Sequence, residues 1–434
     1  MDITLGMTVE AFLKCDNGRH PVTIQLNSNM IAPAHLGATV IGRANVDGST
    51  RTMMALLEGL DLQSIGVAAP RMAREFHLTP GELGWVFGIN ALGLLPGSAI
   101  GGWLADRIGR KNMLMLAVAW FGIFSILTTQ VWNLDSLLVA RFLTGLGLGG
   151  AMPTLIALCS ETTPPERRGT VVGAMYCGLP FGAVFASLIG IISNAEDAWR
   201  HIFYLGGIGP LLTLPLLALF LKESNQYISA SEKGGVQASG AVVDALWKGG
   251  RASTTLALWL SYLCTLIVLY FLINWLPTLV LSRGLTPLQA SSVQIMFNIG
   301  AGIGAISIAA LFDRSSKRVV VIATYIAVVI ALLALAAATN GVAMAAGGLF
   351  AGLFLTGAQS VLYALAGTAY PVAVRGTGIG AAGAVGRLGS VIGPLLAGIL
   401  LGQGQSGVML VASSVLLIVF AAAGLLRASR NIFS

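Results

Sequence analysis

Long apolar runs dominate this sequence of 434 residues. Each run is close to the ~20 residues that an α-helix needs to cross a bilayer. Only 10% of the residues are charged, against about 25% in ordinary soluble domains. Because lipid offers no partner to backbone polar groups, such runs have to form helices. We predict an all-α membrane protein with twelve spans, at about 52–70, 83–105, 112–131, 135–160, 170–193, 201–221, 254–281, 288–312, 318–339, 341–369, 376–400 and 408–427.

The longest polar interval divides these runs into six and six. We predict an N-terminal six-helix bundle over 51–221, a cytoplasmic linker over 222–253 and a C-terminal six-helix bundle over 254–434. Residues 1–50 are polar and unpatterned, and they lack a signal peptide's basic start and apolar core. We expect a disordered cytoplasmic tail there. Few apolar residues precede Glu58, so we also expect a shortened first helix, as a misplaced start of translation or a frameshift would produce.

An internal repeat supports the division into two halves. The stretch Asp106-Arg107-Ile108-Gly109-Arg110-Lys111 recurs as Asp313-Arg314-Ser315-Ser316-Lys317-Arg318, at an offset of 207 residues. The same offset relates Arg168-Gly169-Thr170 to Arg375-Gly376-Thr377, and it relates Gly93, Gly97 and Gly145 to Gly300, Gly304 and Gly352. We therefore predict two pseudo-symmetric six-helix bundles.

A charged loop lies between the second and third spans. Its charges belong at the water interface, since each would cost ~2.5–3.5 kcal/mol at the bilayer centre. We expect Gly102 to admit a neighbouring helix and Gly109 to form the turn. We assign a gating role to this motif, with Asp106 pairing with the other half to hold the inner mouth shut. The gating residues are Gly102, Asp106, Arg107, Gly109, Arg110 and Lys111, with Asp313 and Arg314 in the second copy.

The basic residues predict the orientation. With both termini inside, the inner loops and C-terminal tail hold fifteen Lys and Arg residues, and the outer loops hold four. Lys and Arg concentrate in cytoplasmic loops. We expect both termini to be cytoplasmic.

Two acidic residues lie in the first span. Glu58 and Asp61 are three residues apart, so they share one helix face. Two buried carboxylates so close repel each other, and at least one is expected to bind and release a proton. We predict a proton-coupling role for both. The alternative is a position at the outer rim of the membrane.

Two arginines also lie at membrane depth. Arg141 is in the fourth span and its repeat mate is Gly348. A charge present in only one half favours a functional role over a purely structural one. The alternative is an Arg that snorkels to the interface. Arg387 lies eleven residues after Gly376, about 16 Å deep. It needs an anion, which a substrate carboxylate can supply in bidentate geometry. The alternative is a structural ion pair with Glu58 or Asp61.

Several uncharged side chains complete the predicted substrate site. Aromatic rings can stack on an aromatic acid, and phenols or amides can bond a ring hydroxyl. Any single aromatic residue is more often part of the core or of the interface belt. The predicted substrate-binding residues are Tyr176, Asn274, Gln359 and Tyr363, besides Arg387.

The motifs resemble those of one transporter family. The pattern G-x-L-A-D-R-x-G-R-K at 102–111 resembles the signature loop of the major facilitator superfamily. The first span resembles the D-G-x-D and G-x-x-A-P motifs of its aromatic acid:proton symporters, with Glu58 in place of the first Asp. That substitution is similar to the hydroxyphenylpropionate transporter branch. The segment Arg141-Phe142-Leu143-Thr144-Gly145 resembles the R-x-x-x-G motif of proton-coupled members, which implies an acidic partner for Arg141.

The resemblance implies a proton-coupled symporter of the bacterial inner membrane that imports an aromatic carboxylate, with a hydroxyphenylpropionate-like acid as substrate. An exporter of drugs or organic acids is the main alternative, although the fifth span lacks the full G-x-x-x-G-P-x-x-G-G pattern typical of antiporters. A membrane sensor or membrane-embedded enzyme is a further one. The four histidines show no metal-ligand spacing, and there is no phosphate-binding loop. We expect no enzyme activity, cofactor, metal or nucleic acid, and a monomer in the bilayer.

Overall fold

The structure is a computed structural model that describes residues 8–11, 22–25, 34–162, 178–192, 199–221, 223, 252–369 and 375–433. The chain divides into two compact units, Met1–Ser49 and Thr50–Ser434. In the first unit, strand β1 (Thr8–Ala11) pairs antiparallel with strand β2 (Val22–Gln25). Helix α1 (Ala34–Glu75) also begins in this unit. These elements differ from the unpatterned tail that we expected over residues 1–50.

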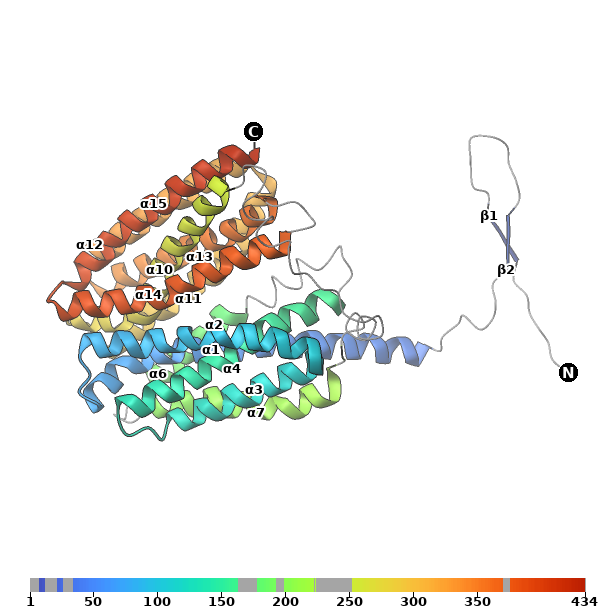
Figure 1. The fold of residues 1–434 in the computed structure, drawn as a ribbon, viewed down its shortest axis with the longest axis horizontal. Coiled ribbons are helices and arrows are strands. Elements are labelled where there is room, and N and C mark those ends of the chain that lie inside the picture. The colour runs from blue at the N-terminus through green and yellow to red at the C-terminus, as the bar shows by residue number, and fades with distance from the viewer. Residues whose placement is uncertain are drawn as a thin grey trace. The chain divides into compact units, whose positions relative to one another are not determined.

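The described chain contains twelve helices in two groups of six (Figure 1). The first group is α1, α2 (Pro80–Ile108), α3 (Arg110–Thr128), α4 (Leu134–Thr162), α6 (Gly178–Ile192) and α7 (Trp199–Phe220). The second is α10 (Ala252–Ser282), α11 (Pro287–Arg314), α12 (Lys317–Ala337), α13 (Gly341–Ala369), α14 (Arg375–Gly402) and α15 (Gly407–Phe433). Within the described residues, ten helices are long and apolar enough to cross a membrane, and α6 is a shorter apolar helix. The predicted all-α membrane fold is confirmed.

Glycine contacts repeat between the two groups of helices. In each group, two helices approach so closely that a Cβ atom added to a glycine would overlap a carbonyl oxygen of the facing helix. Small residues allow such close approach between helices in lipid. Both members of each contact recur at the offset of 207 residues: Gly93–Phe142 with Gly300–Leu349, Gly97–Leu146 with Gly304–Leu353, and Gly145–Asn90 with Gly352–Phe297. The α2–α4 and α11–α13 pairs are therefore built alike.

The helix starts repeat as well. Thr79 caps α2 in a capping box with Glu82, and Thr286 caps α11 in a capping box with Gln289. Each cap precedes a proline at the first helical position, where the missing N–H costs nothing. The Thr79 backbone N–H and hydroxyl both donate to the Glu82 carboxylate. The same capping motif, repeated at the offset of 207 residues, therefore starts both helices.

The helix directions place both copies of the charged loop motif at one face. Helices α10 and α14 run parallel, with successive contacts of Tyr262 with Gly386, Leu263 with Gly389 and Ile267 with Gly393. Helices α2 and α14 run antiparallel, with contacts of Gly84 with Gly398 and Gly88 with Val391. Helix α11 follows α10 after a tight turn at Gly284, so it runs back toward the start of α10. Residues 106–111 and 313–318 thus lie at the same face, called here the motif face.

Glutamate 75 joins three helix ends at the opposite face. Its carboxylate accepts from Arg200 Nη2 at 2.6 Å and from Trp199 Nε1 at 2.6 Å, both at the start of α7. Arg200 Nε also donates to the Thr129 carbonyl at the end of α3, at 3.1 Å. The hydrogen bond from Arg200 lowers the pKa of Glu75. This cluster ties α1, α3 and α7 together at their ends.

Replacing Gly97 by Leu should destabilise the fold, because the new side chain has no room against Leu146 of α4. Overpacking of this kind costs about 1–3 kcal/mol or more. Gly102 on the same helix is the matched control, since a Cβ added there meets no atom within 4 Å. The melting temperature in detergent should fall for Gly97→Leu and stay near wild type for Gly102→Leu. Equal melting temperatures for the two variants would contradict the packing described for α2 and α4.

Candidate functional site

Helix α1 carries three buried polar side chains that face different neighbours. Glu58, Asp61 and Gln63 are 4%, 0% and 2% exposed. At about 100° per residue, Asp61 lies about 60° around the helix from Glu58, whereas Gln63 lies about 140° from Glu58 and about 160° from Asp61. Each therefore belongs to a different cluster of contacts.

Asp61 is paired with Arg141 inside the first group of helices. Arg141 Nη2 lies 3.0 Å from Asp61 Oδ2, and Nη1 lies 3.3 Å from Oδ1. The Ser125 hydroxyl on α3 donates to Oδ1 at 2.9 Å, and the guanidinium lies over the Phe203 ring at 5.1 Å. Both charged side chains are fully buried. Of the two candidate carboxylates, the structure joins Arg141 to Asp61, in bidentate geometry that favours a strong charge-assisted bond.

The repeat mates of this pair carry no charge. Asp61 corresponds to Val268 and Arg141 to Gly348 at the offset of 207 residues. Gly348 instead packs against Val293 of α11. The buried ion pair therefore belongs to one half of the pseudo-symmetric fold, although the surrounding helix contacts are shared by both.

Glu58 belongs to a second group of side chains, which we call the central cluster: Glu58, Tyr270, Gln359, Tyr363 and Arg387. Glu58 interacts electrostatically with Arg387 of α14 as well as with Asp61. Tyr270 on α10 interacts with Arg387, Tyr363 and Glu58. Four helices from both groups thus bring ionisable side chains together here.

Two residues of α13 complete the central cluster. The Tyr363 hydroxyl hydrogen-bonds with Gln359, and the ring packs edge-on against Tyr262 at 5.5 Å between centroids. Tyr363 is 41% exposed and Arg387 is half-buried, whereas Glu58 is almost completely buried. The arrangement offers one cation, two phenols and an amide on the side of α10, α13 and α14 that faces α1.

The other predicted substrate residues have different positions. The Asn274 side chain donates to the Tyr270 carbonyl of its own helix at 2.8 Å. Tyr176 lies outside the described residues. The sequence analysis identified neither Tyr270 nor Gln63 as a site residue. The available signals were a tyrosine one turn before Asn274 and a lone amide in an apolar span.

The charged loop is bound by residues at and just after the end of α7, the last helix of the first group. Gly109 has a φ of 95°, so the predicted need for glycine in the turn is confirmed. The Glu223 carboxylate accepts from the backbone N–H groups of Arg110 at 2.8 Å and Lys111 at 3.2 Å, at the start of α3. Lys111 Nζ donates to the Ala218 carbonyl at 2.6 Å. A carboxylate at a helix N-terminus satisfies free N–H groups and complements the helix dipole.

The expectation that Gly102 admits a neighbouring helix was wrong, because no atom of the described residues lies within 4 Å of a Cβ built there. Arg107 lies over the Trp103 ring at 3.9 Å. Asp313 and Arg314 are exposed at the end of α11. The side chain of Asp106 is not among those described, so its assigned gating contact stays a prediction.

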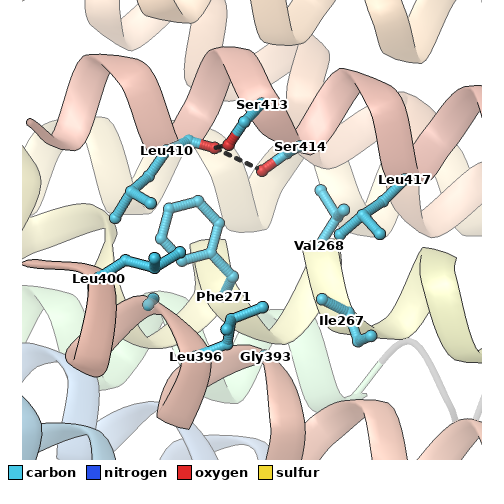
Figure 2. A pocket seen from close by; sticks show the side chains of 11 residues that line it. Ile267, Val268, Phe271, Gly393, Leu396, Leu400, Leu410, Ser413, Ser414 and Leu417 are labelled. Atoms are coloured by element: carbon cyan, nitrogen blue, oxygen red, sulfur yellow. Dashed lines mark hydrogen bonds between the residues drawn. The ribbon is translucent and has the colours of Figure 1, made fainter. Parts of the chain in front are cut away.

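A small apolar pocket lies away from these charges, between α10, α14 and α15 (Figure 2). Its volume is about 60 Å³, and Ile267, Phe271, Leu396 and Leu417 are among the side chains that line it. The hydroxyls of Ser413 and Ser414 both donate to the Leu410 carbonyl. The pocket has no charged lining residue and is too small for an aromatic acid. Among the described residues, no group of three His, Cys, Asp or Glu side chains could hold a metal ion.

Comparison with protein families agrees with this architecture. The family model for the Major Facilitator Superfamily matches residues 52–314 and also residues 258–431. The chain belongs to the major facilitator superfamily. The second match falls on the C-terminal group of helices, in keeping with the internal repeat. The predicted family is confirmed, and the chain is a multi-pass membrane transporter and not an enzyme.

Several relatives transport aromatic acids by name. The chain is 44% identical over 381 residues to the 3-(3-hydroxy-phenyl)propionate transporter of Escherichia coli (strain K12), which covers 87% of this chain and 93% of that protein. It is 31% identical over 380 residues to the 4-hydroxybenzoate transporter PcaK of Pseudomonas putida, covering 81% and 85%.

Solved structures show the same fold. The crystal structure of a D-xylose-proton symporter superposes with a TM-score of 0.73 at 18% identity, covering 87% of this chain and 97% of that one. An inward-facing, unoccupied bacterial homologue of the lysosomal transporter Spinster superposes with a TM-score of 0.72, also at 18% identity, covering 90% and 98%. At this level of identity the likeness concerns the fold alone.

Replacing Arg141 alone by Leu should strongly destabilise the protein, because it leaves Asp61 buried without its counter-ion. Breaking a buried pair from one side costs about 3–5 kcal/mol, whereas replacing both members by apolar residues is often neutral. The double variant Asp61→Leu/Arg141→Leu should therefore recover most of the lost thermal stability. If the double variant melts as low as the single one, the pair is not the source of the loss.

Proposed function

We propose that this protein is a proton-coupled symporter that imports an aromatic carboxylate across the bacterial inner membrane by alternating access. The observation that carries the proposal is the position of the two carboxylates of α1. Asp61 is bound by Arg141 on one side, and Glu58 interacts with Arg387 on the other. Both bundles come from one chain, so the transport path needs no second copy.

The substrate class follows from the central cluster and the relatives. The substrates named for the two relatives, 3-(3-hydroxy-phenyl)propionate and 4-hydroxybenzoate, are each a ring with a hydroxyl and a carboxylate. Arg387 offers a planar fork for a carboxylate. Tyr270 and Tyr363 offer rings and phenol groups, and Gln359 orients the Tyr363 hydroxyl. A hydroxyphenylpropionate-like acid matches these groups.

Coupling to protons is proposed to act through α1. Ionised Glu58 competes with the substrate carboxylate for Arg387. A proton on Glu58 removes that competition, so proton and substrate binding favour one another. Asp61 lies on the same segment of α1 as Glu58, and its bond to Arg141 of α4 depends on the charge of Asp61. An intramembrane ionisable residue with a named partner is a functional candidate by default.

The orientation and state complete the proposal. The motif face carries the excess of Lys and Arg, so we assign it to the cytoplasm, with both termini there. Contacts between the two groups of helices, such as Gly84 with Gly398, lie toward the opposite face. This supports a state that is closed to the outside.

Replacing Asp61 by Asn should abolish proton-driven accumulation, because a neutral amide cannot bind and release a proton. Exchange of labelled for unlabelled substrate should persist, since it needs no net proton movement. Ser125→Ala is the matched control: it removes one hydrogen bond to Asp61 and keeps the charge, so accumulation should continue. The measurement is uptake of a labelled hydroxyphenylpropionate into vesicles with and without an imposed pH gradient. Normal accumulation by Asp61→Asn would show that Asp61 is not the proton carrier.

Replacing Arg387 by Lys should weaken binding of the acid even though the positive charge is kept, because Lys lacks the planar fork. Loss of a buried charge partner costs about 2–5 kcal/mol, or roughly thirtyfold or more in affinity. The amide of the same substrate should bind equally poorly to wild type and variant. Titration of acid and amide against both proteins tests this. Equal weakening of acid and amide in the variant would show that Arg387 holds helices and not the substrate.

A further inference from the structure

Proline 277 leaves a carbonyl group in α10 without its helical partner. Proline has no N–H, so the carbonyl four residues before it, that of Ile273, receives no hydrogen bond from within the helix. Gln63 of α1 supplies the missing donor: its Nε2 lies 3.0 Å from the Ile273 oxygen. A gap in the second bundle is thus filled from the first bundle.

Gly66 makes this approach sterically possible. It lies three residues after Gln63 on α1, and a Cβ atom there would be 2.9 Å from the Ile273 oxygen and 3.2 Å from the Asn274 oxygen. A side chain at this position would push α1 away from α10. The bond from Gln63 therefore depends on close approach of the two backbones.

The Ile273 carbonyl also fixes the direction of the amides beyond it. A carbonyl only accepts, so Gln63 has to turn its NH₂ group toward it and its Oε1 away. Oε1 then accepts from Gln294 Nε2 at 3.1 Å and from Asn298 Nδ2 at 3.5 Å, both on α11. Gln294 in turn directs its own Oε1 to a buried position where it has no hydrogen-bond partner among the described residues.

This chain of amides both stabilises and destabilises the contact between the two bundles. The bonds of Gln63 to Ile273 and Gln294 stabilise the contact between bundles, while the unpartnered Gln294 oxygen destabilises it. That oxygen would regain a partner if water entered the contact. Stabilising and destabilising contributions thus offset one another at this contact. Such a balance is expected of a contact that forms and breaks, because packed interfaces switch between two discrete arrangements.

We propose that Gln63 is the latch that holds the two bundles together away from the motif face, and that Pro277 creates the site to which it binds. The latch forms in the state described and breaks when the bundles part at that end. The proposal rests on the alternating access proposed above, and it assigns Gln63 no contact with substrate or proton.

The test measures how readily the bundles part, with no substrate or pH gradient. Leu395 on α14 contacts Gly88 of α2 across the same bundle interface, so a cysteine there reports separation of the bundles. The variant Leu395→Cys is made after replacing the native Cys15, Cys159, Cys177 and Cys264. In lipid nanodiscs, both faces are open to a maleimide, and its labelling rate is compared between variants.

Gln63→Met keeps the approximate volume of the side chain but cannot make the bonds. It should label about tenfold faster than the parent, the factor expected from losing one or two net hydrogen bonds of the closed state. Ser64→Ala is the matched control on the neighbouring residue, because Ser64 bonds only the Leu60 carbonyl of its own helix in the described contacts. It should label at the parent rate.

A second variant tests the role of proline. Pro277→Ala restores the N–H that binds the Ile273 carbonyl, so adding Gln63→Met to Pro277→Ala should change labelling much less than it does in the parent. A Gln63→Met rate equal to the parent, or an equal increase in both backgrounds, would overturn the proposal. Because the readout is free of substrate, failure of the symport hypothesis would leave this result unaffected.

Discussion

Burying charge in an apolar surrounding is the constraint on which the rest of this structure depends. Asp61 and Arg141 are both fully buried, and they are tolerable there because they bind each other in bidentate geometry with a hydroxyl from Ser125. Three helices, α1, α3 and α4, have to converge for this, and Gly147 of α4 lies so close to α3 that a Cβ atom there would be 2.8 Å from the Phe121 backbone nitrogen. The fold and the functional site are thus parts of one packing solution.

The two halves share their helix packing but carry different charged side chains. The N-terminal half holds a matched ion pair whose repeat mates are Val268 and Gly348. The C-terminal half holds Arg387, whose repeat mate is Pro180, and which interacts electrostatically with Glu58 of α1. Helix α1 contributes to both sites. A movement of α1 relative to the helices around it therefore changes both sets of contacts, as the proposed coupling of proton and substrate requires.

The sequence was sufficient for the helical membrane fold, the repeat and the turn at Gly109, because these depend on local hydrophobicity and backbone conformation. It could not decide whether Arg141 binds Glu58 or Asp61, since that depends on the rotation of α1 against α3 and α4. The prediction of close helix packing at Gly102 was wrong because a glycine in an apolar span is equally consistent with a crowded and an open surface. Asn274 was ambiguous for the same reason: whether an amide bonds its own helix is settled only by its surroundings.

The glycine contacts of α2 with α4 and of α11 with α13 have a mechanical consequence. Where two backbones meet directly, no layer of flexible side chains lies between them to absorb displacement. The two helices of each pair should therefore move together as one rigid unit, without sliding past one another. Contacts of the same kind also join α1 to α10, at Gly66 and Ile273, and α14 to α10, at Gly389 and Leu263. Duplication of the close-packed pair thus gives each half of the molecule a rigid unit that tilts as a whole.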